Sequence, residues 1–268
     1  MGVRQTQSNS DIMSTPHRTR FQESPVMPRI CIAPARAMYI GPGLSLAPHL
    51  NAAATVAIAL DAPFELRTCT NSTGWSEWRS TLSSLIPSET LHHLRSHGPM
   101  VFLYLDPLTD RRLPLGQAEL DGGRERLIDA GPGIGISEAF AAFGLRPRFP
   151  MDERIAKVVL EIEKRPDLFG RQQEAAALAC LSPSRFRERF GAEVGLPFRR
   201  YRMWRRMARV MRKIADGGSL TESAMAAGFS SSAHLSSSFK RMFGLSASDI
   251  IGLGVAIDIS EDHVVSTQ

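Results

Sequence analysis

Residues 178–190, LACLSPSRFRERF, decide the fold of the C-terminal part of this chain. The stretch joins small residues and a tight turn to Ser182-Pro183, which provide a helix N-cap and the first position of a helix. Phe186 and Phe190 are four residues apart and therefore lie on one face of that helix. Two short helices that cross closely at small residues form a helix-turn-helix unit, so the stretch predicts one.

The same pattern recurs at residues 226–239, AAGFSSSAHLSSSF. The two aromatic positions of the first copy recur, at an offset of 49, as Leu235 and Phe239. Gly228 occupies the turn, where a positive φ is expected. The chain is therefore predicted to carry two helix-turn-helix units.

A long helix is predicted between the two units, starting at Pro197 and ending at Asp216-Gly217-Gly218. Its ~19 residues would span roughly 28 Å. That length suits two recognition helices about one DNA turn, ~34 Å, apart. The helix carries eight basic residues: Arg199, Arg200, Arg202, Arg205, Arg206, Arg209, Arg212 and Lys213. We expect about two or three of them to contact phosphates and the rest to form a solvated face.

The charge distribution points in the same direction. Residues 151–250 have a net charge of +7, whereas the remainder of the chain has a net charge of −2. The C-terminal part is therefore expected to bind a polyanion. Three widely spaced cysteines predict neither a disulfide framework nor a zinc site, and they fit a reducing compartment. The polar N-terminus lacks the apolar stretch of a signal peptide, and no apolar run is long enough for a bilayer. We expect a cytoplasmic protein with no membrane partner.

The N-terminal half contains short apolar runs separated by glycine and proline. They predict strands near residues 38–40, 55–60, 64–67 and 100–105, and an all-β sandwich or barrel. The glycine-rich run at 131–135 is interpreted as a turn or helix end, because it lacks the Lys-Ser/Thr of a phosphate loop. The predicted fold class is α+β. The predicted divisions are a disordered tail (1–28), a β domain (29–110), connecting helices and linker (111–150), a DNA-binding domain (151–250) and a C-terminal tail (251–268).

The C-terminal motifs resemble the AraC/XylS family of transcription regulators across residues 151–249. The matching positions are 179–186, Phe190, Gly195, Tyr201, 227–230, 233–235 and 239–244. The resemblance implies seven helices whose two recognition helices enter adjacent major grooves of a double-stranded operator. It also implies an activator that contacts RNA polymerase. A repressor without an effector, and a nucleoid-type or RNA-binding protein without an operator, remain as alternatives.

The resemblance also assigns roles to residues. By position, the base-reading side chains would be Ser184, Arg187, Glu188, Ser232, Ala233, His234, Ser236 and Ser237. Phosphate contacts are expected from Arg185, Arg202, Arg205, Arg206 and Lys240. Arg187 on guanine and Glu188 on cytosine would discriminate bases, while the short serines of the second helix would add fit and phosphate contacts. Alternatively, Arg187 binds a phosphate and Glu188 pairs with Arg185 or Arg189.

The N-terminal domain resembles the cupin-like sensor of some members of this family. Gly43 to His49 and Pro87 to His92 have the spacings of the two cupin motifs. Asn51, Ala54 and Thr55 occupy the stretch where further metal ligands should stand, so neither a metal nor a cofactor is expected. His49 and His92 are expected to bind a small-molecule effector in a barrel. Alternatively, they are hydrogen-bonded core histidines in a domain that forms a homodimer. A cupin enzyme fused to a DNA-binding domain has the wrong ligand count, and no catalytic residue is assigned.

Overall fold

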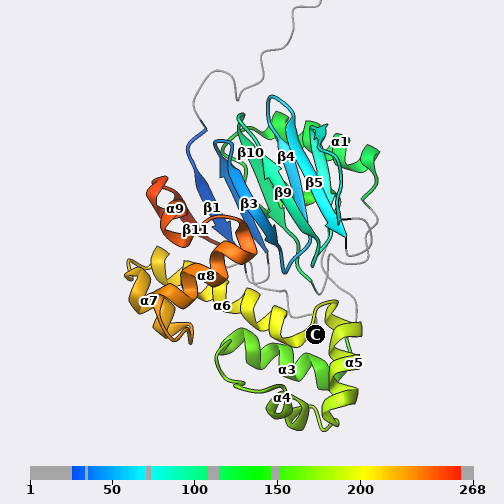
Figure 1. Cartoon of the computed structure of the whole chain (residues 1–268), viewed down its shortest axis with the longest axis vertical. Coiled ribbons are helices and arrows are strands. Elements are labelled where there is room, and N and C mark those ends of the chain that lie inside the picture. The colour runs from blue at the N-terminus through cyan, green and yellow to red at the C-terminus, as the bar shows by residue number, and fades with distance from the viewer. Residues whose placement is uncertain (1–25, 34–35, 71–73, 108–114, 146–150, 261–268) are drawn as a thin grey trace, which may run out of the picture.

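The computed structural model describes residues 26–33, 36–70, 74–107, 115–145 and 151–260. The predicted tail, residues 1–28, lies almost wholly outside these ranges. The chain forms a β-sandwich half followed by a helical half, and one long helix lies at the boundary between them (Figure 1). This arrangement confirms the predicted α+β class.

Two separate sheets make up the first half. One has the strand order β11-β1-β2-β10-β4-β8. The other has the order β3-β9-β5-β6, with β7 also paired to β5. The bounds are β1 Arg29–Ile32, β2 Ala37–Gly41, β3 Ser45–Leu50, β4 Thr55–Ala59, β5 Phe64–Thr70, β6 Gly74–Trp75, β7 Arg79–Thr81, β8 Ser83–Ile86, β9 Leu91–Arg95, β10 Met100–Tyr104 and β11 Ala256–Ile259. The four predicted strands are present as β2, β4, β5 and β10.

Of the two predicted alternatives, a sandwich and a barrel, the structure has the sandwich, because no strand ladder joins the two sheets in the described residues. The sheets instead pack face to face through Phe64 and Leu66 of β5 and Phe102 of β10. The opposite face of the larger sheet is also covered, since Met38, Val56 and other side chains pack against two helices. Burial on both faces explains why every residue of β4 is buried.

Those two helices are α1 (Gln117–Ala130) and α2 (Ile136–Ala141), within the segment predicted to hold connecting helices. Leu127 of α1 and Phe140 of α2 are buried against the sheet. The glycine-rich run between them forms the turn, and Gly131 adopts a φ of 83° at the end of α1. The predicted linker's last residues, 146–150, lie outside the described ranges.

Seven helices form the C-terminal half, as the resemblance implied. They are α3 Glu153–Lys164, α4 Gln172–Leu178, α5 Pro183–Val194, α6 Phe198–Ala215, α7 Leu220–Ala226, α8 Ser232–Phe243 and α9 Ala247–Gly252. Phe186, Phe190 and Tyr201 are fully buried in its core. No helix in the described part of the chain is both long enough and apolar enough to cross a membrane.

The segment after α9 differs from the predicted tail. β11 pairs in parallel with β1, so the end of the helical half returns to the sandwich. Asp258 lies 3.6 Å from the guanidinium of Arg29, which adds an ion pair to this ladder. The prediction failed because the four residues of β11 gain their partner from a strand more than two hundred residues earlier. Residues beyond 260 are outside the described ranges.

The two halves also meet at the C-terminal end of α8. The amide of Ala47 in β3 donates to the carbonyl of Gly244 over 2.9 Å. Nearby, the Tyr104 ring of β10 lies edge-on to Phe243 of α8, with centroids 5.5 Å apart. Tyr104 also packs against Trp204 of α6, at 5.8 Å. The second recognition helix is therefore anchored on the sandwich.

Candidate DNA-binding surface and interdomain pocket

The first helix-turn-helix unit consists of α4, a turn and α5. The Ser182 hydroxyl accepts a hydrogen bond from the Arg185 amide over 3.3 Å, and Pro183 is the first residue of α5, as predicted. Phe186 and Phe190 hold the inner face of α5 in the core. The outer face presents the predicted readers Ser184, Arg187 and Glu188, all exposed.

The charged side chains of α5 differ in their contacts. Glu188 lies 3.5 Å from Arg185, an exposed pair of the kind expected to contribute little to stability. Among the residues that the structure describes, Arg187 has no ion-pair partner, so its guanidinium is available to a ligand. The assignment of Arg187 and Glu188 to bases, and of Arg185 to a phosphate, stays a prediction.

The second unit consists of α7, a turn and α8. Gly228 in the turn adopts the expected positive φ, 80°. Ser231 caps α8, because its hydroxyl accepts from the His234 amide over 3.1 Å. Leu235 and Phe239 are buried, whereas the predicted readers Ala233, His234 and Ser237 are exposed and Ser232 and Ser236 are half-buried. Lys240, predicted to contact a phosphate, is also exposed.

The arginines of α6 serve mainly the interior of the protein. Arg205 is only 4% exposed and lies 3.6 Å from Glu163 of α3, a position that argues against its predicted phosphate contact, which stays a prediction. The sequence could not show this, because arginine is ordinarily a surface residue and its helical position alone does not reveal a partner. Arg205 is therefore better described as part of the domain core.

Two other predicted phosphate contacts, Arg202 and Arg206, are half-buried. Arg202 donates to the Pro166 carbonyl over 3.4 Å, and Arg206 donates to the Ala227 carbonyl over 2.8 Å. Burial lowers the pKa of both guanidinium groups. Their role toward DNA stays a prediction, but both already fix parts of the helix-turn-helix domain.

Further arginines of α6 bind the sandwich. Arg200 lies 3.0 Å from Glu89 in the turn between β8 and β9. Arg212, near the other end of α6, donates to the Ala33 carbonyl over 3.3 Å. We predicted that α6 would carry a basic side facing DNA. Many of its arginines instead contact other parts of the protein, both within the helical half and in the sandwich.

The structure brings the predicted effector residues His49 and His92 together. They face each other across β3 and β9 with ring centroids 4.0 Å apart, and both are buried. Their Nδ1 atoms contact the carbonyls of Ala47 and Thr90, each over 2.8 Å. Burial, together with the neighbouring His92, lowers the pKa of His49 to about 3, and burial also lowers that of His92. Both rings are therefore neutral.

Two histidines are fewer protein ligands than a zinc or iron centre ordinarily uses. Within the described ranges, no group of three or more His, Cys, Asp or Glu residues is placed to hold a metal ion. His49 packs against α8, since a Cβ on Gly244 would lie 2.7 Å from its Nδ1 atom. Neither histidine lines the apolar pocket between the two halves. Their role in effector binding stays a prediction.

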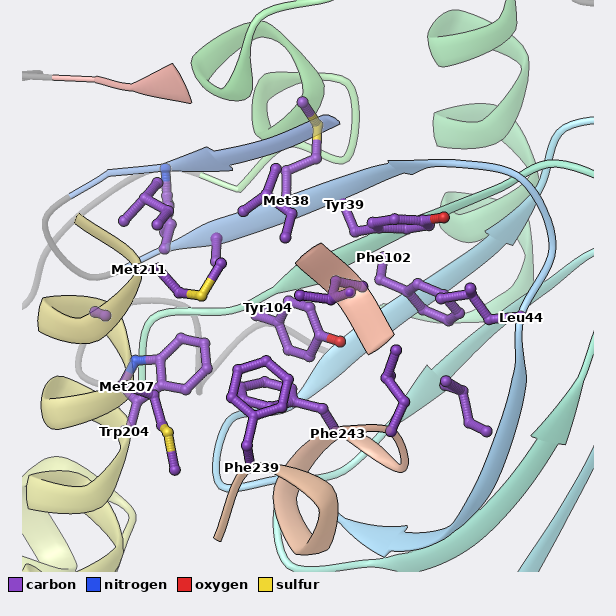
Figure 2. Close-up of a pocket in the computed structure, with 18 residues that line it drawn as sticks. Met38, Tyr39, Leu44, Phe102, Tyr104, Trp204, Met207, Met211, Phe239 and Phe243 are labelled. Carbon is purple, nitrogen blue, oxygen red and sulfur yellow. The ribbon is translucent and has the colours of Figure 1, made fainter. Parts of the chain in front are cut away.

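That apolar pocket is a site that sequence reasoning missed. It encloses about 710 Å³ of empty space, part of it open to solvent. The sandwich contributes β1, β2, β3 and β10, and the helical half contributes α6, α8 and α9 (Figure 2). Its lining is Ile30, Ile32, Arg36, Ala37, Met38, Tyr39, Leu44, Leu46, Phe102, Tyr104, Trp204, Met207, Ala208, Met211, Phe239, Phe243, Leu245 and Ile250.

A few side chains of this mainly apolar lining carry polar groups. Figure 2 shows the hydroxyl of Tyr104 directed into the pocket. Burial raises the pKa of this hydroxyl, so it stays protonated and can donate a hydrogen bond. Arg36 also lines the pocket, with its guanidinium 4.5 Å from the centroid of the Phe140 ring. The only sign of the pocket in the sequence was the apolar stripe of α6, which includes Trp204 and Met207. In the sequence, such a stripe looks the same as one that packs into an ordinary core.

Comparisons with known proteins agree with this architecture. Residues 175–251 match a family described as "Helix-turn-helix domain", and this range contains the whole second unit and the first unit from Ala175 onward. No curated protein matches the sequence. The structure is similar to ToxT from Vibrio cholerae O395, with a TM-score of 0.53 and 11% identity over 82% of this chain and 98% of that one. It is also similar to an apo single-residue variant of ToxT from Vibrio cholerae strain SCE256, with a TM-score of 0.53, 11% identity, and coverage of 82% and 97%.

A third solved structure is ToxT from Vibrio cholerae O395 bound to (E)-4-(8-methylnaphthalen-1-yl)but-3-enoic acid. Its TM-score is 0.52 and its identity 12%, over 82% of this chain and 99% of that one. At such identities the likeness establishes the shared fold, a sandwich half joined to a helical half. The C-terminal region is an AraC-type helix-turn-helix domain, and the chain is a DNA-binding transcription regulator with the two-domain fold of ToxT.

Proposed function

We propose that the protein is a sequence-specific regulator whose DNA binding is controlled by an apolar effector in the interdomain pocket. The two recognition helices, α5 and α8, would enter adjacent major grooves of one operator, at the ends of the 18-residue helix α6. The exposed outer faces of α5 and α8 support this assignment.

The observation that carries the proposal is the origin of the pocket wall. Phe239 and Phe243, from the inner face of α8, line the pocket together with Tyr104 of the sandwich. A molecule in this space would therefore contact the second recognition helix directly. A ligand shifts a conformational equilibrium by the difference of its affinities for the two states. Side chains of α8 in the wall provide such a difference whenever α8 moves relative to the sandwich.

The lining indicates the class of effector. Aromatic and aliphatic side chains surround the space, so a mainly hydrocarbon or aromatic molecule fits it. The Tyr104 hydroxyl suits one polar or acidic group, because it stays protonated and can donate a hydrogen bond. ToxT binds an acid of this type, a naphthyl-substituted butenoic acid, which supports the same class here.

The direction of regulation is part of the proposal. We expect an activator that contacts RNA polymerase, with a homodimer through the sandwich as a further element. Transcription from a promoter carrying the selected operator, with and without the protein, would distinguish activation from repression. Sedimentation of the full chain would measure its oligomeric state.

The test combines DNA selection with ligand titration. Selection from a random duplex library should enrich one site of ~17–20 bp with two major-groove contacts, whereas diffuse, salt-sensitive binding would contradict sequence specificity. The naphthyl-butenoic acid of the ToxT complex serves as the probe and should quench Trp204 fluorescence and change the affinity for the selected site. A bound probe that leaves the DNA affinity unchanged would refute control by the pocket.

A matched pair of substitutions localises the effect. Ala208→Leu places extra atoms in the pocket and should weaken probe binding at least tenfold. Ala118→Leu makes the same chemical change on the exposed side of α1 and should leave probe binding unchanged. Equal probe affinities in the two variants would show that the acid binds elsewhere.

A further inference from the structure

We infer that Ser230 and Phe229 hold the ring of His234 in one orientation, so that its Nε2–H reads a hydrogen-bond acceptor, purine N7, in the major groove. This inference rests on the proposed sequence-specific binding to DNA. It makes His234 the discriminating side chain of the second unit and Ser230 a positioning residue.

The His234 ring has two ordering contacts before any DNA arrives. Its Nδ1 atom lies 3.0 Å from the Ser230 hydroxyl oxygen. Its ring stands edge-on to Phe229, with centroids 5.4 Å apart and an interplanar angle of 78°. The backbone at this position is fixed too, because the His234 amide donates to the cap residue Ser231. The ring therefore approaches DNA with little rotational freedom left to lose.

Phe229 is itself fixed to the connecting helix. It is only 2% exposed, and the Arg206 guanidinium lies 4.0 Å above its ring. Arg206 also donates to the carbonyl of Ala227, two residues before Phe229. The turn also packs closely against Asp167, and only a glycine fits at position 228, since a Cβ there would lie 2.8 Å from the Cβ of Asp167. The orientation of His234 is thus set relative to α6, which also positions the first unit.

The contact with Ser230 determines what the free ring nitrogen can recognise. When the serine hydroxyl donates to Nδ1, the imidazole proton resides on Nε2. An N–H donor in the major groove is complementary to N7 of guanine or adenine. The other exposed or half-buried side chains of the first two turns of α8 are Ser232, Ala233, Ser236 and Ser237, which are all shorter. His234 is therefore the side chain there with the reach to contact a base edge.

The test uses the full chain and selection from a random duplex library, followed by affinity measurements on the selected site. The wild type should require a purine at one position of the second half-site, and replacing that base with its 7-deaza analogue should weaken binding about tenfold. His234→Ala should remove this penalty, and Ser230→Ala should reduce it. Ser248→Ala, an exposed serine substitution on α9, should behave as the wild type.

The outcomes separate the inference from the proposal beneath it. If the wild type enriches no site, sequence-specific binding itself fails. If a site is enriched but His234→Ala keeps the full 7-deaza penalty, His234 is not the reader. If His234→Ala loses the 7-deaza penalty but Ser230→Ala keeps it in full, Ser230 does not position the His234 ring. Nitrogen-15 NMR of the free protein gives an independent result, because a proton found mainly on Nδ1 of His234 would overturn the assigned donor.

Discussion

Gly244 joins the second recognition helix to the sandwich, and replacing it with alanine tests the interdomain contact. The residue ends α8 in the left-handed conformation, with a φ of 80°. A Cβ at this position would lie 2.8 Å from the Ala47 carbonyl oxygen and 2.7 Å from Nδ1 of His49. Real Cβ atoms essentially never approach other atoms that closely, so β3 and α8 must separate.

The expected cost has three parts. The left-handed conformation costs an alanine roughly 1–2 kcal/mol. Overpacking adds ~1–3 kcal/mol, and the weakened bond from the Ala47 amide to the Gly244 carbonyl adds ~1 kcal/mol. Gly217→Ala supplies the control, since Gly217 has a φ of 87° but open space around its Cβ position. Gly244→Ala should therefore lower the free energy of unfolding by ~2–4 kcal/mol more than Gly217→Ala.

Urea denaturation of both variants measures this difference. Hydrogen exchange localises it, because the Ala47 amide should lose protection in Gly244→Ala and keep it in Gly217→Ala. Equal destabilisation by the two substitutions, with the Ala47 amide still protected, would refute the reasoning that α8 is seated on β3.

Two further predictions concern buried polar groups. Because burial lowers the pKa of His49 from 6.5 to about 3, and also lowers that of His92, the unfolded chain binds protons that the folded chain does not. The free energy of unfolding should thus be constant above about pH 7 and decrease as the pH falls from 6.5 toward 3. The His49→Gln variant should lose less of its unfolding free energy between pH 7 and 5 than the wild type does. Parallel stability curves for the two proteins would contradict the assignment. Arg205→Met should lower the unfolding free energy by ~3 kcal/mol, since it leaves the partly buried carboxylate of Glu163 without this partner. Arg205→Met should leave the salt dependence of DNA binding unchanged, whereas Arg187→Ala should alter DNA binding without affecting stability. If Arg205→Met instead made DNA binding less dependent on salt concentration, Arg205 would contact a phosphate after all.

The local features of the helical half could be predicted from the sequence because short-range rules determine them. Ser182 caps α5 and Gly228 forms the turn of the second unit, and each is recognisable from a few neighbouring residues. Four strands of the sandwich, β2, β4, β5 and β10, were recognisable for the same reason. Their assembly into two sheets was not, because apolar alternation describes a strand and not its partners.

The features that the sequence could not predict depend on distant partners. The pocket is assembled from β1, β2, β3, β10, α6, α8 and α9, and its side chains look like ordinary core in each segment. The arginines of α6 gave a misleading signal in the same way. A charge pattern counts cations but does not show that Arg205 is buried beside Glu163 or that Arg200 reaches Glu89.

The parallel strand β11 has a consequence for handling this protein. It occupies the edge of the larger sheet beside β1, with three of its four side chains exposed, and contributes the charge of Asp258 at that edge. A chain cut after Gly254 would leave the backbone donors and acceptors of β1 open to strands of other molecules. Truncation there should promote self-association even though the recognition helices α5 and α8 are unchanged. The four residues of β11 therefore protect the edge of the sheet from aggregation.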